Sequence, residues 1–271
     1  MDEPEPRVDV RKTYKLFIDG QFPRSESGRS YHVDGVWAAR ASRKDLRDAV
    51  RSARGALDGW SGRTAYNRGQ ILYRVAEVME GRRAQFAEEG AADDEIDSAI
   101  DRWVWYAGWA DKIHQLAGTV NPVAGPFFDF TMPEPVGVVG VAAPEEPALL
   151  GLVSRLAPVL TGGNVAVVLA SEAAPRSAIT LAEVLATSDL PAGVAAVLTG
   201  YKAELLPWLA AHRDVDALDL GGAPPELVAG AEEAAADNVK RVIRPADPVG
   251  ESPGDVIAFL EMKTVWHPVG R

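Results

Sequence analysis

The stretch that decides the fold starts at Val138-Val139-Gly140-Val141-Ala142-Ala143 and extends to residue 243. Four more short apolar runs follow, at residues 165–169, 195–198, 215–220 and 239–243. Segments with helical spacing separate them, at residues 148–160, 177–186, 203–211 and 225–236. Apolar strands that alternate with helices are typical of a parallel sheet covered on both faces. The pattern predicts an α/β fold, with a Rossmann-like doubly wound parallel sheet over residues 136–243.

Upstream of this sheet, residues 14–118 are expected to form a hairpin and N-terminal helices. Asp19-Gly20 stands between apolar residues, which predicts a type I′ turn. Ser42, with Asp45 three positions later, is a candidate helix N-cap. The apolar spacing then predicts helices from 43 to about 60, 65–89 and 93–116. Residues 1–13 are polar and charged and are expected to be a flexible arm.

The C-terminal part breaks the alternating pattern. Residues 244–255 contain three prolines and two glycines, which predicts a linker rather than an element. Residues 256–271 return to apolar β-type side chains, with no helical segment behind them. A strand in this position cannot extend the doubly wound sheet, so it must pair elsewhere.

Composition excludes several classes of function. The 271 residues carry a net charge of −11, which argues against a nucleic-acid partner. There is no cysteine, so these residues offer no disulfide, thiolate metal site or cysteine nucleophile. The four histidines lack metal-ligand spacing, so we predict no metal. Without a long apolar span or a signal-peptide pattern, we expect a cytoplasmic protein with no membrane partner.

A series of short stretches resembles the NAD(P)-dependent aldehyde dehydrogenase family. Each is weak alone, but their order and spacing agree over about 230 residues. They are Leu16 to Phe22, Trp105 to Lys112, Glu134 to Gly140, Leu156-Ala157-Pro158 with Gly163-Asn164, Leu190 to Val194, Thr199-Gly200, His212 to Asp216 and Asn238 to Val242.

The tail is similar to the extreme C-terminal strand of that family. In the family this strand, here Phe259 to Trp266, lies beyond a whole catalytic domain, whereas here it follows only the linker. The resemblance therefore implies a degenerate member in which residues 244–255 replace the cysteine-bearing domain. What remains resembles the cofactor-type domain plus oligomerisation strands at residues 119–135 and 256–271. The expected partners of the last strand are residues 119–123 and 127–134.

The resemblance implies that the family's chemistry is lost. Its oxyanion-hole Asn aligns with Glu146, whose charge would oppose a developing oxyanion by about 4 kcal/mol at ~4 Å. Its general-base Glu aligns with Pro245, which cannot move a proton. We therefore predict no catalytic residue. An acid–base pair of Glu145 and Glu146 is a weaker alternative.

The nucleotide site that the family would have is also altered. The ribose-binding Lys aligns with Leu169, but Glu172 remains and could accept from ribose hydroxyls, or be a solvated loop acid. Gly222 aligns with the phosphate-turn glycine, yet Pro224 and Pro225 after it have no N–H to offer. Glu172 and Gly222 are thus residual candidates for cofactor binding. No cofactor is expected, and binding of NAD(P) is a weak possibility.

These losses favour a pseudoenzyme that keeps the fold. The leading hypothesis is a structural or regulatory subunit that assembles with a full-length aldehyde dehydrogenase. Contact would be made by two segments, Thr119 to Glu134 and Val256 to Arg271. The alternatives are an NAD(P)-sensing module, a homo-oligomeric structural protein and, least favoured, an active aldehyde oxidoreductase with another nucleophile.

Overall fold

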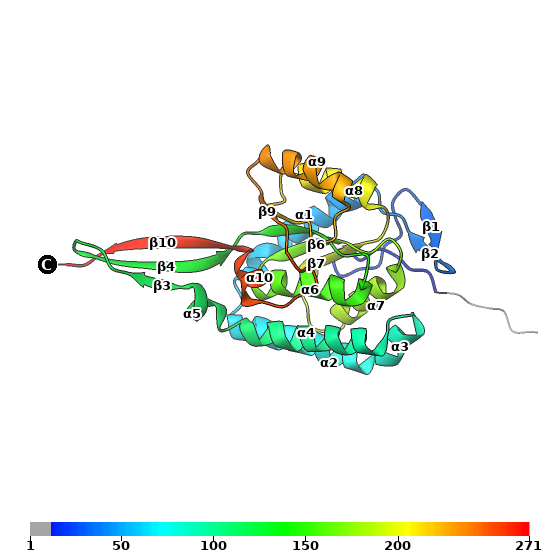
Figure 1. Cartoon of the computed structure of the whole chain (residues 1–271), viewed down its shortest axis with the longest axis horizontal. Helices are drawn as coiled ribbons and strands as arrows, with labels where there is room; N and C mark the ends of the chain where they lie inside the picture. The colour runs from blue at the N-terminus through cyan, green and yellow to red at the C-terminus, as the bar shows by residue number, and fades with distance from the viewer. Residues whose placement is uncertain (1–11, 271) are drawn as a thin grey trace, which may run out of the picture.

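Five parallel strands form the central sheet of the computed structural model, which describes residues 12–270 (Figure 1). The flexible arm predicted over residues 1–13 lies, up to residue 11, outside the described residues. The order of the strands in the sheet is β7-β6-β5-β8-β9. The strands are β5 (Val138–Ala142), β6 (Val165–Leu169), β7 (Ala195–Leu198), β8 (Ala217–Asp219) and β9 (Arg241–Ile243). β5, β6 and β7 are buried throughout, as continuous apolar runs require. The predicted α/β fold with a doubly wound parallel sheet is confirmed.

Helices cover both faces of this sheet. One face carries α1 (Arg43–Ser61), α8 (Lys202–Ala211) and α9 (Pro225–Ala236). The other carries α6 (Ala148–Thr161) and α7 (Pro175–Ala186). An outer layer, formed by α2 (Ala65–Gly81) and α4 (Asp93–Trp109), packs on α6. No helix in the described part of the chain is long and apolar enough to cross a membrane.

The N-terminal helices begin where predicted, and α1 also ends where predicted, but the next two end earlier. Ser42 and Asp45 form the expected capping box at the start of α1. The single helix predicted over 65–89 is wrong, because the chain leaves helical geometry at Arg82 before α3 (Arg83–Glu88). The one predicted over 93–116 likewise divides into α4 and α5 (Ile113–Ala117). Gly81 and Gly108 stand close to the two breaks, where glycine weakens a helix.

Two Asp-Gly turns shape the segment before α1. Asp19 and Gly20 have φ values of 54° and 69°, so the predicted type I′ turn is present, closed by a bridge between Ile18 and Gln21. The sequence analysis missed a second hairpin, β1 (Ser30–Val33) with β2 (Val36–Ala39). It turns at Asp34-Gly35, the same signal that identified the first turn.

A separate antiparallel sheet projects from the body of the molecule (Figure 1). β10 (Leu260–Pro268) pairs with β4 (Phe127–Pro135) over nine residue pairs, and β3 (Thr119–Asn121) pairs with the other edge of β4. The expected pairing of the tail with residues 127–134 is confirmed, but the expected pairing with residues 119–123 is wrong, because β3 lies on the opposite edge of β4 from β10. The predicted start of the tail strand at residue 256 is wrong, since residues up to Ile257 belong to α10 (Pro253–Ile257). We call the sheet of β3, β4 and β10 the arm.

The linker is more ordered than its proline content suggested. Ser252 caps α10 by accepting a hydrogen bond from the N–H of Gly254, because its side chain reaches the free donors of the first turn. Earlier in the linker, the buried guanidinium of Arg102 donates to the carbonyls of Val249 and Gly250 at 2.7 and 2.6 Å. Residues 249–257 are therefore fixed against α4 and α6 rather than free of the body.

Asn164 fixes the base of the arm. Its side chain is fully buried, accepts from the N–H of Gly137 at 2.8 Å and donates to the carbonyl of Phe259 at 3.0 Å. The N–H of Val136 donates to the same carbonyl at 3.1 Å. One side chain thereby joins the start of the parallel sheet to the residue that precedes β10.

Replacing Asn164 by Ala should destabilise the protein by about 2–4 kcal/mol. The change leaves a buried N–H and a buried carbonyl without their side-chain partner, at about 1–3 kcal/mol each. Urea unfolding of the Asn164→Ala and wild-type proteins measures the difference. The control is Asn67→Ala in the partly exposed first turn of α2, which should change stability by less than about 0.5 kcal/mol. Equal effects of the two substitutions would contradict the role of Asn164.

Candidate functional site

The candidate site lies where the strand order reverses. β5 is followed in space by β6 and β7 on one side and by β8 and β9 on the other. In open α/β sheets, ligands bind outside the carboxyl ends of the strands at such a switch point. Here the loops after β5, β6, β7 and β8 meet, and they bring together the residues that the sequence identified.

Glu145, in the loop after β5, is held by the loops after β6 and β7. Its carboxylate pairs with the ammonium of Lys202, whose side chain is fully buried at the start of α8. The hydroxyl of Ser171 and the N–H of Glu172 donate to the same carboxylate at 2.9 and 2.8 Å. These donors are therefore already satisfied by a carboxylate of the chain itself.

The surroundings of Glu145 favour its ionised form. Burial alone would raise the pKa of this carboxyl, but the charge and hydrogen bond of Lys202 outweigh it. Donation from Ser171 and from the N–H of Glu172 adds to the same effect. The net result is a pKa below the ordinary value for Glu, so Glu145 is negative at neutral pH.

The two predicted cofactor candidates flank the loop after β5, with Glu172 in the loop after β6 and Gly222 in the loop after β8. Glu172 accepts from the N–H of Lys202 at 2.7 Å, which caps α8. Gly222 donates its N–H to the carbonyl of Ala142 at 2.8 Å. A Cβ atom on Gly222 would fall 2.1 Å from the carbonyl carbon of Ala143, so only glycine allows the loop after β8 to lie against the end of β5. Both Glu172 and Gly222 thus have structural roles that account for their presence without a bound cofactor.

The helix N-termini around the crevice have little left to offer an anion. The N–H groups of Leu149 and Leu150, at the start of α6, donate to Glu95 of α4 at 2.8 and 3.0 Å. α9 begins at Pro224 and Pro225, which have no N–H. A pocket of about 510 Å³ remains beside these loops, and acidic side chains line it: Glu95, Glu145 and Glu146.

Nothing in this geometry assembles an acid–base pair. Glu146 is exposed, while Glu145 is engaged with Lys202 and the loop after β6. Among residues 12–270, no group of three or more His, Asp or Glu side chains is placed to hold a metal ion.

The sequence did not predict the ion pairs that two buried cations make, those of Arg155 and of Lys202. The guanidinium of Arg155 donates to Asp219 at 2.7 Å, and both side chains are fully buried. Arg155 also lies 3.4 Å from Asp255 in α10, to which Tyr106 donates at 3.1 Å. Arg155 is the only charge in an otherwise apolar segment, which was a signal for a buried partner. Lys202 carried no such signal, because it stands among ordinary helix-start residues.

Family comparison gives this fold and site a context. The model of the aldehyde dehydrogenase family matches residues 34–244. The chain is 30% identical to human retinal dehydrogenase 2 over 282 residues, which covers 97% of this chain and 53% of that protein. It is also 30% identical to the putative aldehyde dehydrogenase DhaS of Bacillus subtilis, covering 94% and 54% of the two proteins. The chain thus spans about half the length of the curated relatives it matches.

Solved structures agree with the family match. The HpcC protein of Thermus thermophilus superposes with a TM-score of 0.79 at 28% identity, over 85% of this chain and 47% of that one. An NAD-dependent aldehyde dehydrogenase from Sinorhizobium meliloti gives a TM-score of 0.78 at 27% identity, over 89% and 51%. PnpE, solved in complex with nicotinamide adenine dinucleotide, gives 0.77 at 27%, over 84% and 50%.

Replacing Glu145 by Gln should destabilise the protein by about 1–2 kcal/mol at pH 7, because buried Lys202 loses its counter-charge. The folded-state pKa of Glu145 is lowered, so its contribution exists above the ordinary Glu pKa and disappears as pH falls through the lowered value. The difference between Glu145→Gln and wild type should therefore shrink on acidification. Urea unfolding at pH 7 and pH 3 measures it.

The matched control is Glu146→Gln, one residue away on an exposed side chain, which should leave stability unchanged at both pH values. A destabilisation by Glu145→Gln that stays the same at both pH values would show that the charge is not responsible.

Proposed function

The chain belongs to the aldehyde dehydrogenase family, and on that premise we propose that it is a catalytically inactive subunit that assembles through its arm with a full-length member. Its role is structural or regulatory. The observation that carries this proposal is the arm itself, which extends a largely apolar, open-edged sheet away from the body (Figure 1).

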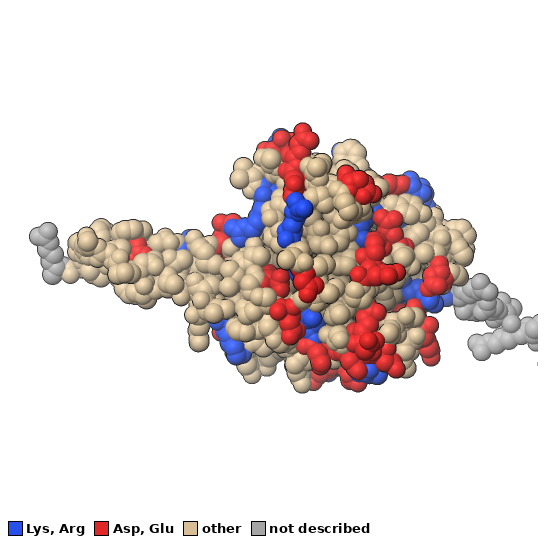
Figure 2. Space-filling model, in the orientation of Figure 1, with Lys and Arg blue, Asp and Glu red and all other residues tan. Residues whose placement is uncertain are grey.

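Large apolar side chains are exposed along the arm. Trp266 on β10 is 58% exposed and Val120 on β3 is 68% exposed, and four further large apolar side chains are exposed on β4 and β10. These others are Phe127, Phe128, Met132 and Met262. On the face drawn in Figure 2 the arm shows few charged side chains, whereas acidic side chains are spread over the body. An apolar surface of this kind is typical of a protein–protein contact.

The edge of β10 supports the same conclusion. Within the described residues, β10 pairs on one side only, with β4. An edge strand of nine residues offers unpaired N–H and carbonyl groups to another chain. Pairing with a neighbour's sheet would satisfy these groups and cover the apolar side chains beside them.

The proposed loss of activity rests on what occupies the reactive positions. The 271 residues contain no cysteine to attack an aldehyde. Glu146 is exposed at the position where the family resemblance places an oxyanion donor. In an assembly of the proposed kind, the full-length partner would supply the chemistry.

The crevice residues do not fit a dinucleotide. A pyrophosphate carries negative charge, but Glu145 already holds the available hydroxyl and N–H donors and Glu95 holds those of α6. The neighbouring carboxylates would also repel it. A dinucleotide-sensing role is therefore the less favoured function.

We expect NAD at millimolar concentration to leave amide hydrogen exchange unchanged in residues 143–147, 170–174 and 220–224. These loops line the crevice, so a bound dinucleotide would slow exchange there. The measurement is local and so separates the crevice from any other site on the protein. Saturable protection of all three loops would contradict the proposal and favour the sensor.

Removing residues 261–271 should abolish co-purification with the full-length partner and leave the body folded. The cut preserves Phe259 and Leu260, which are buried at the base of the arm, and removes almost all of β10. Size-exclusion chromatography with mass identification of the bound chain gives the readout, and thermal unfolding confirms the fold.

A chain that ends at Pro268 is the matched control, because it keeps the whole β4–β10 ladder. It should bind the partner as the full chain does. Full retention of the partner by the longer truncation would remove the arm from the interface.

A further inference from the structure

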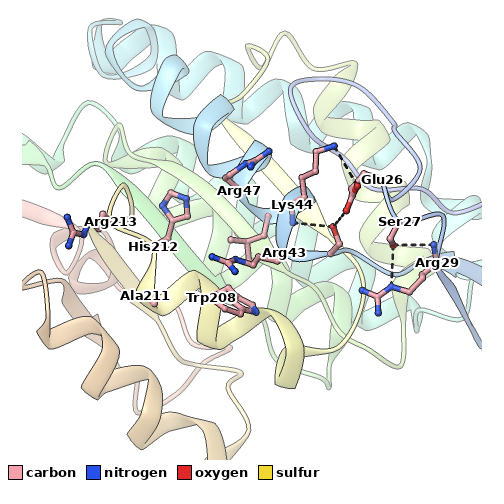
Figure 3. A pocket seen from close by; sticks show the side chains of 12 residues that line it. Glu26, Ser27, Arg29, Arg43, Lys44, Arg47, Trp208, Ala211, His212 and Arg213 are labelled. Atoms are coloured by element: carbon pink, nitrogen blue, oxygen red, sulfur yellow. Dashed lines mark hydrogen bonds and ion pairs between the residues drawn. The ribbon is translucent and has the colours of Figure 1, made fainter.

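A basic hollow lies on the face of the sheet covered by α1 and α8 (Figure 3), and it shares no lining residue with the acidic pocket beside the crevice. Its volume is about 870 Å³, within the range of small-molecule pockets. The first turns of α1, the C-terminal end of α8 and the loop before β1 enclose it.

Cationic side chains dominate its lining. Five line it, Arg29, Arg43, Lys44, Arg47 and Arg213, against one carboxylate, Glu26. This concentration is notable in a chain whose net charge is −11. Such a cluster costs free energy through mutual repulsion unless an anion offsets it.

Most of these charges are not neutralised by the protein. Glu26 lies 3.6 Å from Lys44, and Arg47 pairs with Asp48 outside the hollow. Within the described residues, Arg29, Arg43 and Arg213 have no carboxylate within ion-pair distance. Guanidinium groups bind phosphate through two parallel hydrogen bonds, which makes them the usual partners of phosphate esters.

The hollow also has an aromatic wall. Trp208 of α8 is 43% exposed, and the guanidinium of Arg43 stacks 3.8 Å from its ring centre. Arg43 and Trp208 also line an adjoining hollow of about 410 Å³. An exposed indole beside unpaired arginines suits a ligand with a planar ring and a phosphate group.

The backbone N–H groups at the start of α1 are not free to bind an anion. The N–H groups of Lys44 and Asp45 donate to the hydroxyl of Ser42, so the capping box already satisfies them. Anion binding here depends on side chains, which substitutions can remove one at a time.

We propose that this hollow is a binding site for a nucleoside polyphosphate. The phosphates would lie among Arg29, Arg43 and Arg213, and the base against Trp208. The site is separate from both the crevice and the arm, so the proposal does not depend on the assembly function. A ligand bound there would contact α1 and α8 together.

Titration calorimetry of the full chain with ATP at low salt tests the proposal. ATP should bind at one saturable site, and pyrophosphate more weakly. Arg213→Glu and Arg43→Glu should each weaken ATP binding at least tenfold. A glutamate at position 43 suits the first turn of a helix, so that variant should remain folded. The control is Arg51→Glu, the same charge reversal on an exposed α1 residue outside the hollow, which should change affinity less than twofold.

Trp208→Ala separates the two parts of the ligand. It should weaken ATP at least fivefold and leave pyrophosphate within twofold of wild type. Absence of saturable ATP binding at millimolar concentration would overturn the proposal, as would equal losses in Arg51→Glu and Arg213→Glu. Binding of polyglutamate but not of ATP would overturn it in favour of an acidic protein partner.

Discussion

The arrangement of this protein depends on the pairing of β10 with β4. Nine residue pairs bring the C-terminal segment back to the middle of the chain, and Asn164 fixes the point where the pairing begins. Because the ends of β4 and β10 nearest the body are then set, the arm has a defined direction relative to the parallel sheet. The apolar surface, the open edge and the proposed mode of assembly all follow from this contact.

The body and the arm serve different purposes in this view. The parallel sheet has a well-packed apolar core, and buried Arg155 of α6 pairs with both Asp219 of β8 and Asp255 of α10. Its crevice is occupied by carboxylates of the chain, above all Glu145 with Lys202. These contacts favour a stable support over a ligand-binding enzyme, because donors that a substrate would need are already satisfied.

Pattern reading located the elements that have a strong periodic signal. β6 and β7 were predicted to the residue, because short apolar runs between turns leave little choice, and the cap at Ser42 was likewise explicit. The breaks at Arg82 and after Trp109 were missed, since single glycines near a helix end give only a weak preference. The role of the tail as a strand paired with β4 came from family resemblance, not from periodicity.

The candidate site was less predictable than the fold. The sequence identified Glu145, Glu172 and Gly222, but it did not show that the first two would be joined through Lys202. Contacts between charged residues distant in sequence depend on tertiary structure and leave no local pattern. The basic hollow was missed for the same reason, because Arg29, Arg43 and Arg213 come from three separate segments.

In the proposed assembly, the arm joins this chain to a full-length aldehyde dehydrogenase. Native mass spectrometry of the protein purified from its own cell tests this contact. We predict a complex of fixed stoichiometry that contains both chains. A mass that corresponds to this chain alone, or only to copies of it, would contradict the proposed assembly.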